Sequence, residues 1–350
     1  MCAGDDPVQA GSKRVSRGLA STRHKLAEDF ALAKIRAVAY DQYGGPEVLR
    51  EALIEAPMPR DGEVLVRVHA ASVNGYDIAV RSGAMKIVTG RRFPKRTGLD
   101  FAGDVAAVGA ATAHFKAGDR VWGCLPLHRV GSAAELVCIA AEHLAHRPAG
   151  LDPAEAAALP VVGSTAITAV RDMGRLRPGQ RLLVRGASGG VGSVAIQLGR
   201  ALGAHVTGLA SAANLPFVRE HGADVALDYA TTAPDQLEPF DVILDTVGRR
   251  PADWRRRLAP RGRMMAIVPD LEHPFMSMAY FAWSRIHGGR RVRFFSDKPD
   301  TQLLTDLANY VQNGSIKPIV DAVHPLSDIA NAHRALEAGG RRGKQVVSLA

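Results

Sequence analysis

The sequence has few cysteines, few aromatic residues and no long apolar run. Its three cysteines, at positions 2, 124 and 138, have spacings that fit neither a disulfide framework nor a zinc knuckle. Such a chain is typical of a reducing compartment, so we expect a cytoplasmic protein. No stretch of 18 apolar residues occurs, which argues against a membrane-spanning helix.

Acidic residues are outnumbered, with 35 Asp and Glu against 44 Lys and Arg and a formal net charge of +9. Arginines gather between 249 and 263, as they would on a nucleic-acid surface. Apart from Trp254, however, this cluster contains no aromatic residue that could stack on bases, so a solvated face is the better interpretation. We therefore expect no nucleic-acid partner, although some of the charge could attract an anionic cofactor or a thioester substrate.

The remaining composition is that of an ordinary globular protein, with 350 residues, 47% hydrophobic and 23% charged. This length is sufficient for two domains with substantial cores. Residues 1–34 have no firm periodicity and no continuous apolar segment, and their early acids, Asp5 and Asp6, argue against a transit peptide. We interpret residues 1–34 as a flexible N-terminal extension.

The clearest pattern in the chain is a strand, a glycine-rich turn, a helix and a second strand between Arg181 and Ser211. Ala187, Gly189 and Gly192 stand at the G-x-G-x-x-G spacing, with alanine in the first position. Small residues at these positions allow a tight turn, the approach of a pyrophosphate and close helix packing, and the helix N-terminus offers free N–H groups to phosphates. No Gly-Lys-Ser/Thr closes the turn, so a P-loop is excluded and the pattern predicts dinucleotide binding.

The absence of acidic residues after the glycine turn indicates which dinucleotide binds. NAD sites usually place Asp or Glu at the end of the second strand, but no acid occurs from Ala187 to Arg219, and Ser211 stands at the expected position. The small hydroxyl leaves room for a 2′-phosphate, and the nearby charges, His205 and Arg219, are basic. The sequence therefore favours NADP(H), although Ser211 could also cap the following helix.

The patterns on either side of this unit differ from each other. Short alternating segments before residue 160 indicate a β domain, whereas strands alternating with helices after Ser211 indicate a parallel sheet with helices on both faces. Towards the end, we expect a strand over Ile316–Val320 and a helix over Ser327–Glu337 that begins with a serine cap.

Several short motifs follow one another between about residue 35 and the end of the chain. They are Ala71-Ser72-Val73-Asn74 with Asp77 and Arg81, Gly98 to Gly103, Phe115 to Val121, Gly186 to Gly192, His221 to Asp224 with Asp228 and Tyr229, Asp245 to Gly248, and Gly343-Lys344. In this order they resemble the zinc-independent quinone oxidoreductase (zeta-crystallin-like) branch of the medium-chain dehydrogenase/reductase superfamily. Within that branch, the reticulon-interacting oxidoreductase subgroup is the most similar.

The resemblance implies an α/β fold in which a Rossmann doubly wound parallel sheet is inserted in a discontinuous GroES-like β domain. The GroES-like substrate domain would comprise residues 35–160 and 298–350, and the Rossmann NADP-binding domain residues 161–297. Members of the branch are mostly dimers, so the resemblance also implies a homodimer.

The resemblance implies a set of cofactor contacts around the turn and the strand ends. It assigns Ser188, Gly189, Gly190, Val191 and Gly192 to the pyrophosphate, Ser211 and Tyr229 to the 2′-phosphate and adenosine, Thr246, Ile267 and Phe295 to the nicotinamide side, and Arg342 to the returning tail. Asn74 and Thr165 match residues near the nicotinamide end. Many members carry a lysine where Asn214 stands here, so the preference for NADPH rests on Ser211, the missing acid and Arg219 or Arg342.

The resemblance also bears on metal binding. Zinc alcohol dehydrogenases of the superfamily hold the catalytic metal with Cys, His and Cys at positions that match Asn74, Leu99 and Val161. Leucine and valine cannot ligate a metal, and asparagine alone is a poor zinc ligand. The four-cysteine structural zinc loop is missing as well. We therefore expect no metal site and no metal-assisted alcohol oxidation.

Without a metal, the chemistry that fits is direct hydride transfer from NADPH to an electron-poor small molecule such as a quinone or an enone. We expect Asn74 and Tyr76 to be the catalytic residues. Asn74 matches a residue near the nicotinamide end, and Tyr76 is the one phenol between Asn74 and Arg81 that could protonate carbon. Two alternatives stay open: an NADPH-dependent enoyl thioester reductase on the same fold, and an NADPH-binding structural or adaptor protein with incidental turnover.

Overall fold

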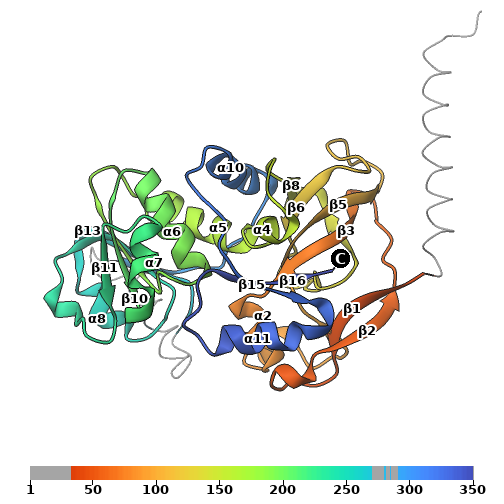
Figure 1. Ribbon diagram of the computed structural model, residues 1–350, viewed down its shortest axis with the longest axis horizontal. Helices are drawn as coiled ribbons and strands as arrows, with labels where there is room; N and C mark the ends of the chain where they lie inside the picture. Colours follow the sequence, from red (N-terminus) through yellow and green to blue (C-terminus); the bar gives the residue numbers. More distant parts are fainter. Residues whose placement is uncertain (1–32, 270–279, 281–283, 285–290, 350) are drawn as a thin grey trace, which may run out of the picture.

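The computed structural model describes residues 33–269, 280, 284 and 291–349. The predicted N-terminal extension lies outside them except for its last two residues. The described chain forms two β-rich units at opposite ends of the molecule, with helices α5 (Pro160–Ile167) and α10 (Thr301–Gln312) between them (Figure 1). None of the described helices is long and apolar enough to span a membrane.

The first unit is a six-stranded sheet in which every neighbouring pair of strands is parallel. The strand order, β11-β10-β9-β12-β13-β14, is that of a Rossmann fold, with the topological switch between β9 and β12. Helices α6 (Gly190–Ala201), α7 (Leu215–Glu220) and α8 (Pro251–Arg255) connect strands of this sheet. The strands are β9 (Arg181–Arg185), β10 (His205–Ala210), β11 (Val225–Asp228), β12 (Phe240–Asp245), β13 (Leu258–Ala266) and β14 (Arg291–Phe294).

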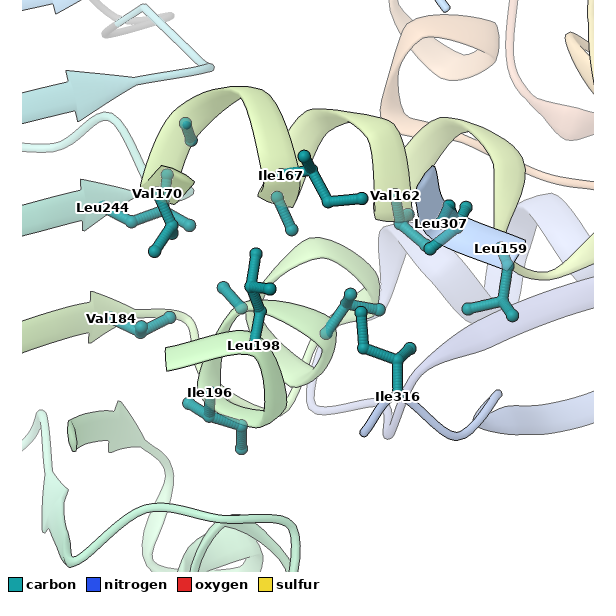
Figure 2. Close-up of a cluster of buried hydrophobic side chains, with 14 of the residues drawn as sticks. Leu159, Val162, Ile167, Val170, Val184, Ile196, Leu198, Leu244, Leu307 and Ile316 are labelled. Carbon is teal, nitrogen blue, oxygen red and sulfur yellow. The ribbon is translucent and has the colours of Figure 1, made fainter. Parts of the chain in front are cut away.

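The central strand β9 is apolar throughout its middle because both of its faces are covered. Leu182 and Val184 belong to the core cluster that contains α5 and α6, whereas Leu183 belongs to a cluster on the opposite face of the sheet. Figure 2 shows the first cluster, to which Val184 of β9, Leu198 of α6 and Ile167 of α5 all contribute side chains. This packing fixes α6, and with it the glycine turn that precedes α6.

The second unit is a mostly antiparallel sheet to which the end of the chain returns. The strand order is β15-β16-β3-β5-β6-β8, and β7 also pairs with β3. Strand β16 lies antiparallel to β3, with Val347 opposite Ala71, so the C-terminal segment completes the N-terminal domain. The strands are β3 (Glu63–Ser72), β5 (Asp100–Val108), β6 (Arg120–Cys124), β7 (Leu136–Ala140), β8 (Leu144–His146), β15 (Val320–Pro325) and β16 (Lys344–Ser348).

Shorter elements surround this sheet. A further three-stranded sheet has the order β2-β1-β4. Its strands are β1 (Lys34–Tyr40), β2 (Arg50–Glu55) and β4 (Lys95–Arg96), and the helices of this unit are α2 (Gly75–Arg81), α3 (Lys86–Thr89), α4 (Pro153–Ala157) and α11 (Ile329–Glu337). The predicted architecture, a parallel Rossmann sheet inserted in a discontinuous β domain, is confirmed.

Two local predictions near the C-terminus are wrong. Residues 316–319 form a loop and the strand begins only at Val320, because the backbone of Lys317 is bonded on both sides by the amide of Gln197 rather than by a neighbouring strand. Ile316 is apolar because it is buried in the core shown in Figure 2. Helix α11 begins at Ile329 after a 3-10 turn, and its N-cap is Asp328 rather than Ser327.

Candidate active site

The glycine turn between β9 and α6 has the shape that a pyrophosphate needs. A Cβ added to Gly189 would find only the carbonyl oxygen of Gly186 within 4 Å, at 3.5 Å, so the backbone there has free space beside it. A Cβ on Gly192 would lie 2.1 Å from the same oxygen, which explains the close packing of the helix on the turn. Gly189 is the N-cap residue of α6, so the first N–H groups of a twelve-residue helix point out of this turn. The turn therefore fits a dinucleotide phosphate.

Thr246, Ile267 and Phe295 follow the carboxyl ends of β12, β13 and β14, where ligands of such sheets bind. The Thr246 hydroxyl donates to the carbonyl oxygen of Arg185 at 2.7 Å, at the start of the glycine turn. Ile267 and Phe295 are both half-buried against the same core cluster, and the Phe295 N–H bonds the carbonyl oxygen of Ala266 at 3.4 Å. Thr165 is buried in α5.

A buried ion pair between Arg185 and Asp245 holds together the strand ends next to the glycine turn. Arg185 Nη1 lies 2.6 Å from Asp245 Oδ2, and the two side chains are 8% and 0% exposed. Asp245 Oδ1 also accepts the N–H groups of Val247 and Gly248, at 2.9 and 3.0 Å. Burial lowers the pKa of Arg185, and the Asp245 carboxylate opposes that change. The pair therefore fixes the end of β12, where Thr246 lies.

The loop after β10 is bonded to the returning tail by Asn214, which in the sequence is only a departure from the family pattern. Asn214 is buried, its Nδ2 donates to Ser188 Oγ at 3.2 Å and to the Gly340 carbonyl oxygen at 3.1 Å, and its Oδ1 accepts from Arg342 Nε at 2.9 Å. Arg342 also donates to the carbonyl oxygen of Ala213 at 3.1 Å. The predicted tail residue is thus brought to the loop that Ser211 begins.

Three further residues of the predicted 2′-phosphate region lie in or after the elements that follow β10. Ser211 precedes a 3-10 turn, but its hydroxyl makes no capping hydrogen bond, so the capping alternative is not supported. Tyr229 follows β11 and is 65% exposed. The Arg219 guanidinium donates to the Ala226 carbonyl oxygen at 3.3 Å, so it is held against β11.

A second buried polar cluster surrounds Asn74, the predicted catalytic residue at the end of β3. Asn74 Nδ2 donates to Asp100 Oδ1 at 2.9 Å and to the Ser72 carbonyl oxygen at 3.4 Å. Asn74 Oδ1 accepts from Lys344 Nζ at 2.5 Å, and this ammonium also donates to the Val73 carbonyl oxygen at 2.9 Å. Lys344 and Asp100 were noted in the sequence only as members of motifs. The sequence signal for Lys344 is a lysine at the first position of an apolar strand.

Asp77 bonds the backbone of Asn74 and that of Gly98. Its two carboxylate oxygens accept the N–H groups of Asn74 and Gly98, both at 2.9 Å. Burial raises the pKa of Asp77 to about 6, although these two N–H groups act in the opposite direction. Asp77 thereby joins the start of α2 to the segment before β5.

Tyr76, the predicted proton donor, is the second residue of α2. Its hydroxyl donates to the Leu127 carbonyl oxygen at 3.0 Å. Burial raises the pKa of Tyr76, with the neighbouring Asp77 acting in the same direction, so the phenol keeps its proton at neutral pH.

The three positions that match zinc ligands lie around the Asp100 carboxylate, and their side chains do not form a metal site. Leu99 precedes Asp100 and is buried, and the Val161 N–H approaches Asp100 Oδ2 at 3.3 Å. Among the residues that the structure describes, no three His, Cys, Asp or Glu side chains gather as they would to hold a metal ion. Cys124, which lies opposite Asp100 in the pairing of β5 with β6, is buried, and burial raises its pKa well above the usual value.

Comparison with known proteins supports the same architecture. A family model described as zinc-binding dehydrogenase matches residues 221–347, and one for the alcohol dehydrogenase GroES-like domain matches residues 60–149. The human protein named NAD(P)H oxidoreductase RTN4IP1, mitochondrial, is 33% identical over 88% of this chain and 88% of its own. The chloroplast envelope quinone oxidoreductase homolog of Arabidopsis thaliana is 31% identical over 89% of this chain and 98% of its own. The solved quinone oxidoreductase of Coxiella burnetii has a TM-score of 0.82 at 27% identity, and covers 91% of this chain and 100% of its own.

The expectation of a cytoplasmic protein is wrong, because these curated relatives are named as mitochondrial and chloroplast proteins. A low cysteine content indicates reduced thiols, and reduced thiols do not distinguish the cytoplasm from an organelle interior. The remaining findings agree: a Rossmann sheet with an open glycine turn, a β domain completed by the tail, and relatives that match most of the chain. The chain belongs to the quinone oxidoreductase-like branch of the medium-chain dehydrogenase/reductase superfamily.

Proposed function

We propose that this protein is a zinc-independent, NADPH-dependent oxidoreductase that transfers hydride to quinones or other conjugated carbonyl compounds. Membership of the family makes the chain an NAD(P)H-dependent oxidoreductase with a small-molecule substrate. The finer assignment is supported chiefly by one observation: Asn74, Leu99 and Val161 stand where zinc-dependent members of the superfamily carry metal ligands. An acceptor that no metal polarises must already be electron-poor.

The choice of NADPH over NADH is supported by the charges around the loop after β10. From Ala187 to Arg219 the sequence carries no acid that could bind a 2′-hydroxyl or repel a 2′-phosphate. Ser211 leaves space for the phosphate, and the Arg342 guanidinium is held beside Ala213 and Asn214. A planar guanidinium suits a phosphate because it can donate two parallel hydrogen bonds.

The residues of the chain have separate tasks in this proposal. NADPH, when bound, supplies the hydride. The turn from Ser188 to Gly192 holds the pyrophosphate at the N-terminus of α6. Ile267 and Phe295 pack along the nicotinamide side, and Thr165 and Asn74 lie near its reacting end. A quinone then needs only protons from water, whereas an enone needs a proton at carbon.

A panel of acceptors tests the proposal. Oxidation of NADPH and of NADH is followed at 340 nm with 9,10-phenanthrenequinone, an α,β-unsaturated ketone and crotonyl-CoA, before and after dialysis against a chelator. We expect turnover with NADPH and the quinone or the ketone, unchanged by chelation. Stoichiometric zinc with loss of activity on its removal would contradict zinc independence. A Ser211→Asp variant should shift preference towards NADH, because the new carboxylate repels the 2′-phosphate.

The second candidate is an enoyl thioester reductase, and it is favoured by Tyr76, two residues after Asn74, whose pKa is raised by burial so that the phenol stays protonated. It predicts activity only with crotonyl-CoA and a loss of that activity in Tyr76→Phe. If Tyr76→Phe leaves enoyl reduction unchanged, Tyr76 is not the proton donor. Tight NADPH binding without turnover on the whole panel would instead favour a structural or adaptor role. The homodimer implied by the family is tested by light scattering on the same preparation.

A further inference from the structure

Lys344 connects the cofactor turn with the Asn74 cluster. The N–H of Gly343, the residue before it, donates to the Ser188 carbonyl oxygen at 2.9 Å, and Gly343 forms an isolated parallel bridge with Gly189. The tail is thus hydrogen-bonded directly to the glycine turn at the point where Lys344 begins.

The aliphatic part of the Lys344 side chain lies against the same turn. A Cβ added to Gly190 would lie 2.9 Å from Lys344 Cδ and 3.0 Å from Val162 Cγ1, so the missing side chain of Gly190 makes room for the lysine. Lys344 is 5% exposed, although lysine is almost never fully buried unless it is paired. The Lys344 stem therefore explains why position 190 is a glycine, in addition to the glycines at the G-x-G-x-x-G positions.

The ammonium group at the other end of the side chain holds Asn74. It bonds Asn74 Oδ1 and the Val73 carbonyl oxygen, and its distance to Asp100 Oδ2 is 4.0 Å. Because Lys344 donates to Oδ1, the Asn74 amide must direct its Nδ2 to Asp100. The orientation of Asn74 is therefore set by a residue that also rests on the cofactor turn.

We propose that Lys344 is a positioning residue for hydride transfer: it fixes Asn74 and the acceptor side of the active site relative to the turn that holds the cofactor pyrophosphate. This inference rests on the proposed use of NADPH. The ammonium is occupied by Asn74, Val73 and the Asp100 carboxylate, so Lys344 sets geometry and does not bind phosphate through its charge. Since small displacements of reacting groups reduce rates steeply, its loss should slow the chemical step more than it weakens cofactor binding.

The test is Lys344→Met, which keeps the length of the stem and removes the ammonium, in the full-length chain. We expect kcat with 9,10-phenanthrenequinone to fall 10-fold to 100-fold, while the Kd for NADPH, measured by titration, changes less than threefold. We also expect the emission of bound NADPH to differ from that of the wild-type complex, because the nicotinamide is less firmly held. The matched control is Lys95→Met, which removes a half-buried ammonium that likewise donates to a backbone carbonyl, that of Thr89 at 2.8 Å.

The outcomes separate this inference from the proposed function. The emission and Kd measurements need no acceptor, so they test Lys344 even if the wild-type protein reduces nothing in the panel. Unchanged emission of bound NADPH would overturn the inference, with or without turnover of an acceptor, and so would a Kd raised more than 30-fold, which would mean that Lys344 binds the cofactor phosphates. If Lys344→Met does not fold because Asp100 is left without its cation, the double variant Lys344→Met with Asp100→Asn removes both charges and is expected to show the same split between kcat and Kd.

Discussion

Arg342 Nε donates to Asn214 Oδ1 at 2.9 Å, although the two residues are 128 positions apart in the chain. The family resemblance implies a lysine at position 214, but Asn214 stands there, and an arginine from the tail lies beside it. The Arg342 guanidinium also lies over the Phe217 ring, 5.7 Å from its centroid. The arrangement provides a positive group next to Ser211 without a lysine at 214.

We therefore expect Arg342→Ala to weaken NADPH binding much more than NADH binding. Loss of one charge-assisted contact to a phosphate corresponds to about 1.5–3 kcal/mol, or roughly a 10-fold to 100-fold rise in Kd. Fluorescence titration with both cofactors measures the ratio. The matched control is Arg341→Ala, whose guanidinium instead bonds the Ala335 carbonyl oxygen and lies 4.0 Å from Asp321. Equal losses for both cofactors would show that Arg342 acts only by holding the loop.

The glycine turn permits a comparison of two substitutions three residues apart. Gly189→Ala should fold normally, because the nearest atom to its new methyl group is 3.5 Å away, but should bind NADPH at least 10-fold more weakly, because the methyl group lies where the pyrophosphate approaches. Gly192→Ala should lose stability, because its Cβ would lie 2.1 Å from the Gly186 carbonyl oxygen. Thermal unfolding and titration of both variants check this division. A stable Gly192→Ala protein, or full affinity in Gly189→Ala, would contradict it.

The fold and the turn were predictable from the sequence because both depend on local patterns. The apolar run of β9, the glycine spacing and the helix that follows occupy adjacent positions, and the family motifs place the other strand-end residues such as Thr246. Asn214 and Lys344 were not predictable in the same way, because their partners lie far along the chain: Lys344 bonds Asn74 across 270 positions. Likewise, the prediction of a strand over Ile316–Val320 is wrong because an apolar residue buried in a loop gives the same sequence pattern as one in a strand.

The buried pair of Arg185 and Asp245 leads to a prediction about stability. Asp245→Asn leaves the Arg185 charge buried without a counter-ion, so we expect a loss of about 3–5 kcal/mol in the free energy of unfolding. The matched control is Asp41→Asn, because Asp41 pairs with Arg50 at 2.5 Å but both side chains are more than half exposed. The control should change stability by less than about 1 kcal/mol. Urea denaturation measures the free energy of unfolding of both variants. Equal losses would show that burial does not make the ion pair more important for stability.

His333 leads to a prediction about acid stability. It lies in α11 with no exposed surface, and within the described part of the chain neither ring nitrogen has a hydrogen-bond partner. Burial, together with the nearby Arg81 charge, lowers the pKa of His333 from 6.5 to about 3. Because the unfolded chain takes up this proton near pH 6.5 and the folded chain does not, the contribution of neutral His333 to stability is complete above pH 6.5. It is lost as the pH falls towards 3.

A His333→Leu variant should remove this part of the pH dependence. Between pH 7.5 and 4.5 the free energy of unfolding of the wild-type protein should fall by about 2–3 kcal/mol more than that of the variant, since each pKa unit corresponds to about 1.4 kcal/mol. Denaturant unfolding at a series of pH values measures the two slopes, and the exposed His128, changed to Gln, serves as the control. Parallel slopes for the wild-type protein and His333→Leu would mean that His333 is protonated in the folded state. In that case a buried solvent molecule or a shift of Glu337, which already contacts Arg81, must compensate the charge.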